Sequence, residues 1–114
     1  MSRQLDAAIA KSLGYEVRKT GDEWRYRLPQ FGNVDDVAIW HVVSYYSTDG
    51  NAMLELDSEM RERGHLIEME YLKGKYIARY YYLHQISGVG KAETEPLARA
   101  LAAYKALTGR EWSE

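Results

Sequence analysis

The segment GVGKAET at residues 88–94 contains the residue types of an anion-binding site. Glycine lets the backbone approach a ligand closely, lysine supplies positive charge, and the N–H groups at a helix start favour phosphate. The spacing is not that of a Walker A loop, because Gln85 stands where its first glycine belongs and Ala92 follows the lysine. We expect residues 86–93 to form a loop and predict a weak anion site there. Its residues are Gly88, Gly90, Lys91 and Thr94.

Two other groups of side chains could do chemistry. Ser47, Thr48 and Asp49 place hydroxyls beside a carboxylate, but capping of a helix N-terminus accounts for all three, so no catalytic residue is predicted. His65 and His84 are expected on one face of a hairpin, where they could contribute to a Zn²⁺ site. No third ligand is placed by spacing, and histidine commonly satisfies buried tyrosine hydroxyls. We therefore predict no metal site and no cofactor.

Tyrosine is the third signal, with ten residues in 114 and four of them in KYIARYYYLHQ at residues 75–85. A tyrosine ring supplies apolar area, but its hydroxyl needs a partner, so such rings gather at the rim of a core or at an interface. Stacking of nucleic-acid bases normally needs a positive groove, and Glu68 and Glu70 in the neighbouring strand argue against one. We expect Tyr76 and Tyr80 mostly in the core. The predicted interface residues are Tyr81, Tyr82 and Leu83.

Hydrophobic periodicity predicts three helices that would position these groups. They span residues 3–13, residues 46–64, and a segment that starts near Thr94. Within the second, Asp57 and Arg61 should form an ion pair on the outer side. The expected buried stripes are Leu5, Ala8, Ile9 and Leu13; Ala52, Met53, Leu56 and Met60; and Leu97, Ala100, Leu101, Tyr104 and Leu107.

Alternation of apolar and polar residues predicts two β-hairpins. The first spans residues 15–27 and places Val17 opposite Trp24, with ion pairs on the other face. The second spans residues 65–82 and turns at residues 73–74, so that its first and last residues lie opposite each other. This register puts Tyr76, Tyr80 and Tyr82 on one face of the sheet and Tyr81 on the other.

The element order is therefore α-β-β-α-β-β-α in a single domain, residues 1–114. The expected fold class is α+β: one four-stranded antiparallel sheet from the two hairpins, with helices on both faces in a three-layer α/β/α sandwich. Residues 29–46 are apolar enough to pack down, with an irregular strand near IWHVV at residues 39–43, but their role and the strand order stay open.

Composition limits the classes of function. The net charge of −2 argues against generic nucleic-acid binding, which needs a basic surface. The chain has no cysteine, which excludes disulfides and thiolate sites and suits a reducing cytosol. The N-terminal residues 1–14 break their apolar residues with charges, and no apolar stretch approaches the ~18 residues of a spanning helix. We therefore expect neither signal peptide nor membrane association.

Two segments resemble the phage ABA-sandwich family of small bacteriophage and prophage proteins. Tyr46-Ser47-Thr48-Asp49 matches the opening of that family's central helix. Residues 92–98 and 102–107 match its closing Ala-Glu-Thr-x-Pro-x-Ala and Ala-x-x-Ala-Leu helix. The resemblance implies a three-layer fold and a phage or prophage origin, hence the host cytoplasm, and implies no catalytic residues.

The sequence favours a non-enzymatic phage or prophage accessory protein that acts by protein–protein contact or self-association. Its grounds are the tyrosine-rich sheet, open sheet edges and the lack of a catalytic constellation. The alternative is a small-ligand binder that sequesters a phosphorylated metabolite or signalling nucleotide, in the manner of a counter-defence protein, through the segment at residues 88–94. The partner, the oligomeric state and the step of the phage cycle stay open.

Overall fold

The computed structural model describes residues 3–27 and 40–113, which form three helices and six strands. The order is α1 (Arg3–Ser12), β1 (Glu16–Thr20), β2 (Glu23–Arg27), β3 (His41–Val42), α2 (Gly50–Glu62), β4 (His65–Leu72), β5 (Lys75–Tyr82), β6 (Gln85–Ala92) and α3 (Glu95–Thr108). The fold is α+β as predicted, but the single four-stranded sheet is wrong. The strands form two three-stranded antiparallel sheets, β1-β2-β3 and β4-β5-β6. The expected strand near residues 39–43 is present as β3, and the rest of the segment from residue 29 to 39 lies outside the described residues.

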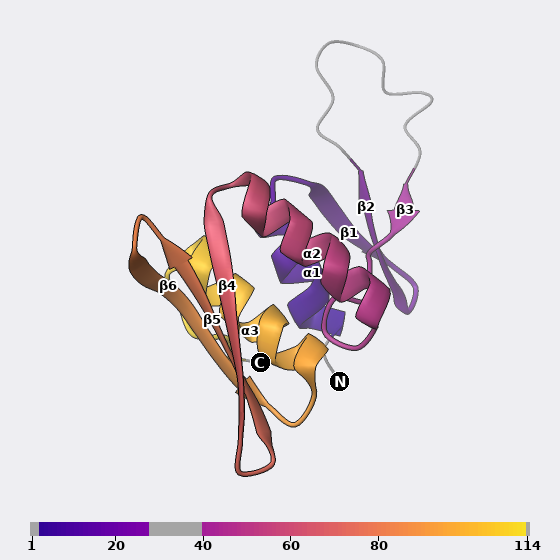
Figure 1. Cartoon of the computed structure of the whole chain (residues 1–114). Helices are drawn as coiled ribbons and strands as arrows, with labels where there is room; N and C mark the ends of the chain where they lie inside the picture. The colour runs from indigo at the N-terminus through magenta and orange to yellow at the C-terminus, as the bar shows by residue number, and fades with distance from the viewer. Residues whose placement is uncertain (1–2, 28–39, 114) are drawn as a thin grey trace.

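The helices lie between the two sheets (Figure 1). Helix α3 packs on β5 and β6, α2 packs on α3 and β4, and α1 packs on α3 and on the hairpin β1-β2. This sheet/helix/sheet order replaces the expected layering with helices on both faces of one sheet. Each small sheet buries one face against the shared helical layer, which satisfies all three amphipathic helices without a second helical layer.

Residues 85–92 form strand β6, which corrects the expectation of a loop. The strand pairs with β5 from Tyr82↔Gln85 to Tyr76↔Ala92, with a bulge opposite the step from Tyr80 to Tyr81. Its two glycines face α3 at very short range: a Cβ would lie 2.1 Å from the Ala102 carbonyl oxygen at Gly88 and 2.2 Å from the Ala98 carbonyl oxygen at Gly90. The glycines therefore serve close packing of strand on helix.

The same close packing corrects the buried stripe of α3. Its fully buried residues are alanines, because only small side chains fit where the helix lies against β6. Leu97, Leu101, Tyr104 and Leu107 pack at the edges of the contact and keep part of their surface exposed. The buried alanines are Ala98, Ala100, Ala102 and Ala103.

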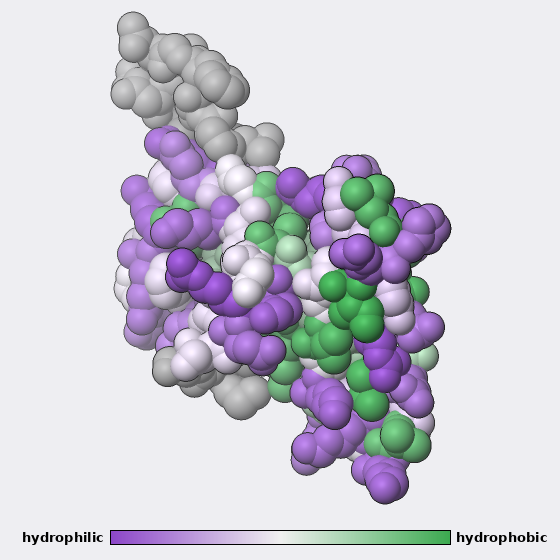
Figure 2. All heavy atoms as spheres, turned by 90° about the vertical axis from the view of Figure 1, so that its left-hand side faces the viewer, coloured by the Kyte–Doolittle hydropathy of each residue, from purple (hydrophilic) through white to green (hydrophobic). Residues whose placement is uncertain are grey.

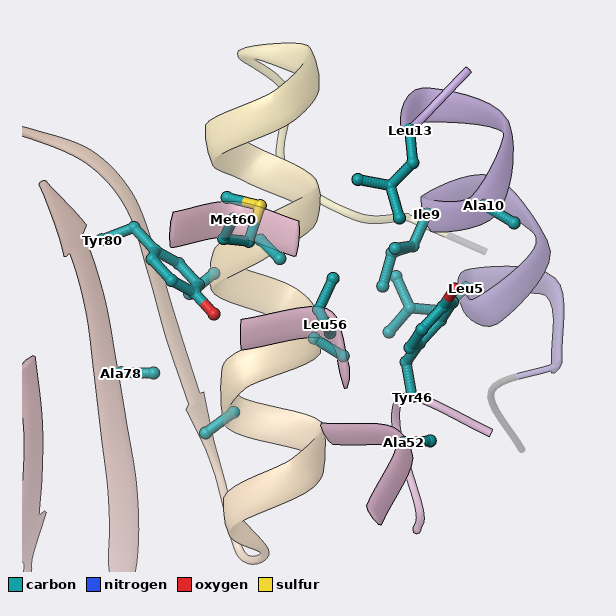
Figure 3. Close-up of a cluster of buried hydrophobic side chains, with 14 of the residues drawn as sticks. Leu5, Ile9, Ala10, Leu13, Tyr46, Ala52, Leu56, Met60, Ala78 and Tyr80 are labelled. Carbon is teal, nitrogen blue, oxygen red and sulfur yellow. The ribbon is translucent and has the colours of Figure 1, made fainter. Parts of the chain in front are cut away.

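Figure 3 shows the core between α1, α2 and β5. The stripes predicted for α1 and α2 are confirmed, with Leu5, Ile9, Leu56 and Met60 completely buried, apart from Ala8, which is half-buried. The predicted capping of the N-termini of α2 and α3 by side chains is also confirmed. Thr94 accepts a hydrogen bond from the Leu97 N–H, and Asp49 accepts one from the Ala52 N–H.

Asp57 is buried, which corrects its expected place on the outer side of α2. Its carboxylate accepts a hydrogen bond of 3.0 Å from the Tyr80 hydroxyl and lies 3.1 Å from the Arg99 guanidinium. The predicted pair with Arg61 is present but longer, at 3.6 Å. Asp57 thus ties α2 to both β5 and α3.

The two hairpins differ in how well their registers were predicted. The β4-β5 register, from His65↔Tyr82 to Leu72↔Lys75, is confirmed residue by residue. The β1-β2 register is wrong by two residues: Val17 lies opposite Tyr26, because the turn is at residues 21–22 and not at 20–21. A shift of two keeps every side chain on its expected face, so the apolar face is right and only the partners change.

Candidate functional site

The face of the β4-β5-β6 sheet that points away from the helices is rich in exposed apolar side chains. Strand alternation puts Leu66 of β4, Tyr81 of β5 and Ile86 of β6 side by side on this face. Leu66 is 63 % exposed and Ile86 is 55 % exposed, whereas Ala78 and Tyr80 on the opposite face are fully buried. Figure 2 looks onto this side of the molecule and shows hydrophobic atoms in a broken band between charged ones. We call this surface the outer face.

Arg79, two glutamates and Tyr81 form one polar network on the outer face. Arg79 lies 3.2 Å from Glu68 and 2.9 Å from Glu70, and the Tyr81 hydroxyl donates to Glu68 at 3.2 Å. The hydrogen bond to Glu70 is the main cause that raises the pKa of Arg79. Desolvation, and then the hydrogen bond to Glu68, raises the pKa of the Tyr81 hydroxyl. Arg79 therefore stays charged and the Tyr81 hydroxyl stays protonated at neutral pH.

The turn between β5 and β6 holds two non-glycine residues in the left-handed region. Leu83 has φ 52° and His84 has φ 66°. Both conformations cost free energy for residues with a Cβ, and such strain gathers at functional sites. The turn holds Leu83 76 % exposed. Beside it is a groove of about 600 Å³, lined by Gly64, Leu66, Glu68, Tyr81, Leu83 and His84.

The three predicted interface residues do not share one surface. Tyr81 lies on the outer face and Leu83 in the strained turn, and both line the groove. Tyr82 points to the helix side of the sheet, where its ring lies 5.0 Å from the His65 ring, although it remains 44 % exposed. Leu66 and Ile86 were missed as interface candidates. Strand alternation relative to Tyr81 was the signal that could have found Leu66. Ile86 could not be placed from the sequence, because residues 86–93 are predicted as a loop.

The two candidate metal ligands are in different surroundings. His65 hydrogen-bonds through Nδ1 to the Ser87 hydroxyl at 2.9 Å, and burial lowers its pKa. His84 is in the turn, at the groove. Across residues 3–27 and 40–113 no group of three or more His, Asp or Glu side chains is placed to hold a metal ion. The Ser87–His65 contact resembles a nucleophile with its base, but no carboxylate orients the histidine among the hydrogen bonds of the described residues.

The predicted anion site divides in a similar way. Gly88 and Gly90 are buried against α3 and present no open backbone to a ligand. Lys91 and Thr94 instead line a pocket of about 650 Å³ at the N-terminal end of α3. The other lining residues are Ser47, Thr48, Lys75, Ala92, Glu93, Pro96 and Leu97.

Two segments that are distant along the chain meet at this pocket. Ser47 and Thr48 come from the turn before α2, and residues 92–97 come from the end of β6 and the start of α3. Lys75 was missed by the sequence reasoning. Lys91 pairs with Ile77 on β5, so Lys75, two residues earlier on the same face, is its diagonal neighbour.

Ser47 is held in place by a buried carboxylate. Its N–H donates to Asp6 Oδ1 at 2.9 Å, and Asp6 Oδ2 lies 2.8 Å from Arg3. Desolvation raises the pKa of Asp6, against the hydrogen bonds from Ser47 and Arg3, which lower it. The Ser47 hydroxyl is buried and has no hydrogen bond of acceptable geometry within the part of the chain that the structure describes. This hydroxyl is closed off from solvent, so Ser47 contributes no accessible side-chain hydrogen-bonding atom to the pocket.

Comparison with known proteins adds no relative: no family model, curated protein or solved structure matches this chain. None of the helices in the described ranges is long and apolar enough to cross a membrane.

Proposed function

We propose that the protein is a non-catalytic binding module that associates with a protein chain through the outer face of the β4-β5-β6 sheet. The observation that carries this proposal is the pair of leucines at the groove, Leu66 at 63 % and Leu83 at 76 % exposure, on a face that no helix of the described residues covers. Exposed apolar clusters of this kind, rimmed by charges, are typical of interaction sites.

The first occupant to test is a second copy of the chain. The outer face carries Arg79 between Glu68 and Glu70, so a two-fold axis through it would bring positive and negative charges of one copy near opposite charges of the other. The edges of this sheet are β4 and β6, and within the described residues neither pairs with a further strand. Unpaired edges are further sites for contact between chains.

A phage or prophage accessory role is supported by the resemblance of residues 46–49 and 92–107 alone. A protein of that kind in the host cytoplasm would act by binding and would need no cofactor. The outer face fits that mode of action, because it offers a surface for a partner.

The experiment is sedimentation velocity over a concentration series, with Leu66→Glu and Leu83→Glu compared with Leu54→Glu. Leu54 is 58 % exposed on α2, away from the outer face, and is a matched control. Burial of one leucine contributes about 1.5–3 kcal/mol, so each outer-face variant should weaken association roughly 10- to 100-fold. The control should behave as wild type.

Two results would contradict self-association through the outer face. One is a wild-type chain that remains monomeric up to about 1 mM, a concentration at which a contact of about 4 kcal/mol is visible. The other is a dimer that Leu54→Glu weakens as much as Leu66→Glu does.

A further inference from the structure

We infer that the pocket between the turn before α2 and the start of α3 binds a small phosphorylated compound with a hydroxyl-rich body, such as a sugar phosphate. This goes beyond the proposed protein contact, because the pocket lies outside the groove of the outer face and shares none of its lining residues.

Two lysines supply the positive charge for a phosphate. Lys75 and Lys91 are diagonal neighbours on adjacent strands, on the outer face by strand alternation, and both line the pocket. Neither forms an ion pair among the described side chains, and Glu93 is the one carboxylate of the lining. Both lysines are exposed, and their positive charges would attract a phosphate to this pocket.

The N-terminus of α3 adds only a little to the positive potential at the pocket. Its dipole places partial positive charge at the pocket. Pro96 has no N–H, however, and the Leu97 N–H is bonded to Thr94, so few backbone donors of the first turn are free for a ligand. The lysines therefore carry the recognition of phosphate, and this differs from a glycine-rich phosphate loop.

The rest of the lining fits a polar body and excludes stacking of a base. Exposed hydroxyls come from Thr48 and Thr94, and the Glu93 carboxylate accepts hydrogen bonds. These groups can pair with the hydroxyls of a ligand. No aromatic ring is among the described lining residues, and the volume of about 650 Å³ is in the range of small-molecule sites.

Binding is tested by isothermal titration calorimetry with ribose 5-phosphate, ribose and inorganic phosphate at constant ionic strength. Amide chemical shifts from ¹⁵N-labelled wild type locate the site. We expect ribose 5-phosphate to bind more tightly than either fragment, with the largest shifts at residues 47–48 and 91–97. Shifts confined to other residues, or equal binding of ribose and ribose 5-phosphate, would overturn the proposal.

The decisive variant is Lys75→Gln/Lys91→Gln, with Lys11→Gln/Lys19→Gln as a control that loses the same charge at exposed positions outside the pocket. The pocket variant should lower affinity for ribose 5-phosphate at least tenfold, about 1.4 kcal/mol, and the control should change it little. Equal losses in the two variants would show a general charge effect and overturn the site. Because all four lysines are exposed, each variant is expected to fold, and unchanged melting temperatures without ligand verify this.

Discussion

The two three-stranded sheets sit on opposite sides of the same helices, yet their outward faces have opposite character. On the β1-β2-β3 sheet the outward face is covered by arginines: Arg18 lies 4.0 Å and Arg27 4.7 Å from the centre of the Trp40 ring. On the β4-β5-β6 sheet the one arginine, Arg79, is held by glutamates, and leucines stay exposed. The Trp40 ring of the first sheet is thus partly covered by cations, whereas Leu66 and Ile86 of the second sheet stay exposed. This contrast supports the proposed protein contact through the outer face.

The sheets also differ in how they are attached to the helices. The second sheet is pressed onto α3 through glycines, and the Tyr80 hydroxyl reaches the buried Asp57 of α2. The first sheet packs Val17, Trp24 and Tyr26 against the core only as partly buried side chains. A part-buried network adds contacts of Arg3 of α1 with Glu23 of β2 at 2.8 Å and with the Val43 carbonyl oxygen at 2.8 Å. Buried attachment makes the second sheet the rigid platform, whereas ionic attachment leaves the first sensitive to charge.

The largest expected effect on the free energy of unfolding comes from replacing a glycine of the second sheet by alanine, compared with the same change in the turn of the first sheet. Gly90→Ala places a Cβ 2.2 Å from the Ala98 carbonyl oxygen, a backbone atom that cannot move alone, so we expect a loss of about 3 kcal/mol or more in the free energy of unfolding. Gly21→Ala, in the β1-β2 turn, meets no atom within 4 Å and is strained only by φ 62°, so about 1 kcal/mol is expected. Urea denaturation measures both. Equal losses would show that β6 is not pressed onto α3.

The next largest effect on stability distinguishes a buried contact between the second sheet and the helices from a partly exposed contact between the first sheet and the helices. Tyr80→Phe removes a buried hydrogen bond and leaves Asp57 with one partner fewer, at a cost of about 1–2 kcal/mol. Glu23→Gln weakens a partly exposed ion pair, for which about 0.5 kcal/mol is expected. The free energies of unfolding of both variants, again from urea titrations, should keep this order. A larger loss for Glu23→Gln would reverse our assignment of the rigid platform.

The parts of the fold that were predictable from the sequence are the local ones. Helix caps at Asp49 and Thr94 and the Lys73-Gly74 turn depend on neighbouring residues, and all three are present in the structure. Strand β6 was missed because QISGVGKA lacks regular alternation and its glycines suggest a loop, although they are required by the approach of α3. A close approach between segments distant along the chain leaves no local pattern, and this also hid the alanine face of α3.

For the candidate sites the limit was the same. Parity along one hairpin places Tyr81 on the outer face. Lys91 and Thr94 could be named for the pocket, but Lys75 and the turn before α2 could not, because their place there depends on β6 as a strand and on that turn reaching the start of α3.

The smallest expected effect is a dependence on pH that belongs to the first sheet's end of the helical layer. Burial raises the pKa of Asp6, so the folded chain holds that proton more tightly than the unfolded chain does. Such a group favours the folded state below its unfolded pKa, and the contribution is lost as pH rises through the folded pKa.

Asp6→Asn keeps an acceptor for the Ser47 N–H and does not titrate. Its free energy of unfolding relative to wild type should therefore rise between about pH 3 and pH 7, as measured by urea titration at several pH values. The control is Asp22→Asn, at an exposed position in the β1-β2 turn. Its free energy of unfolding relative to wild type should change less with pH. Burial instead raises the pKa of Tyr80, which moves its ionisation further from neutral pH, so the attachment of the second sheet gains no such dependence from its hydroxyl. The difference in free energy of unfolding between Asp6→Asn and wild type could instead be constant or fall with pH. In that case Asp6 is not the group that makes the attachment of the first sheet sensitive to pH, and the two attachments differ in burial alone.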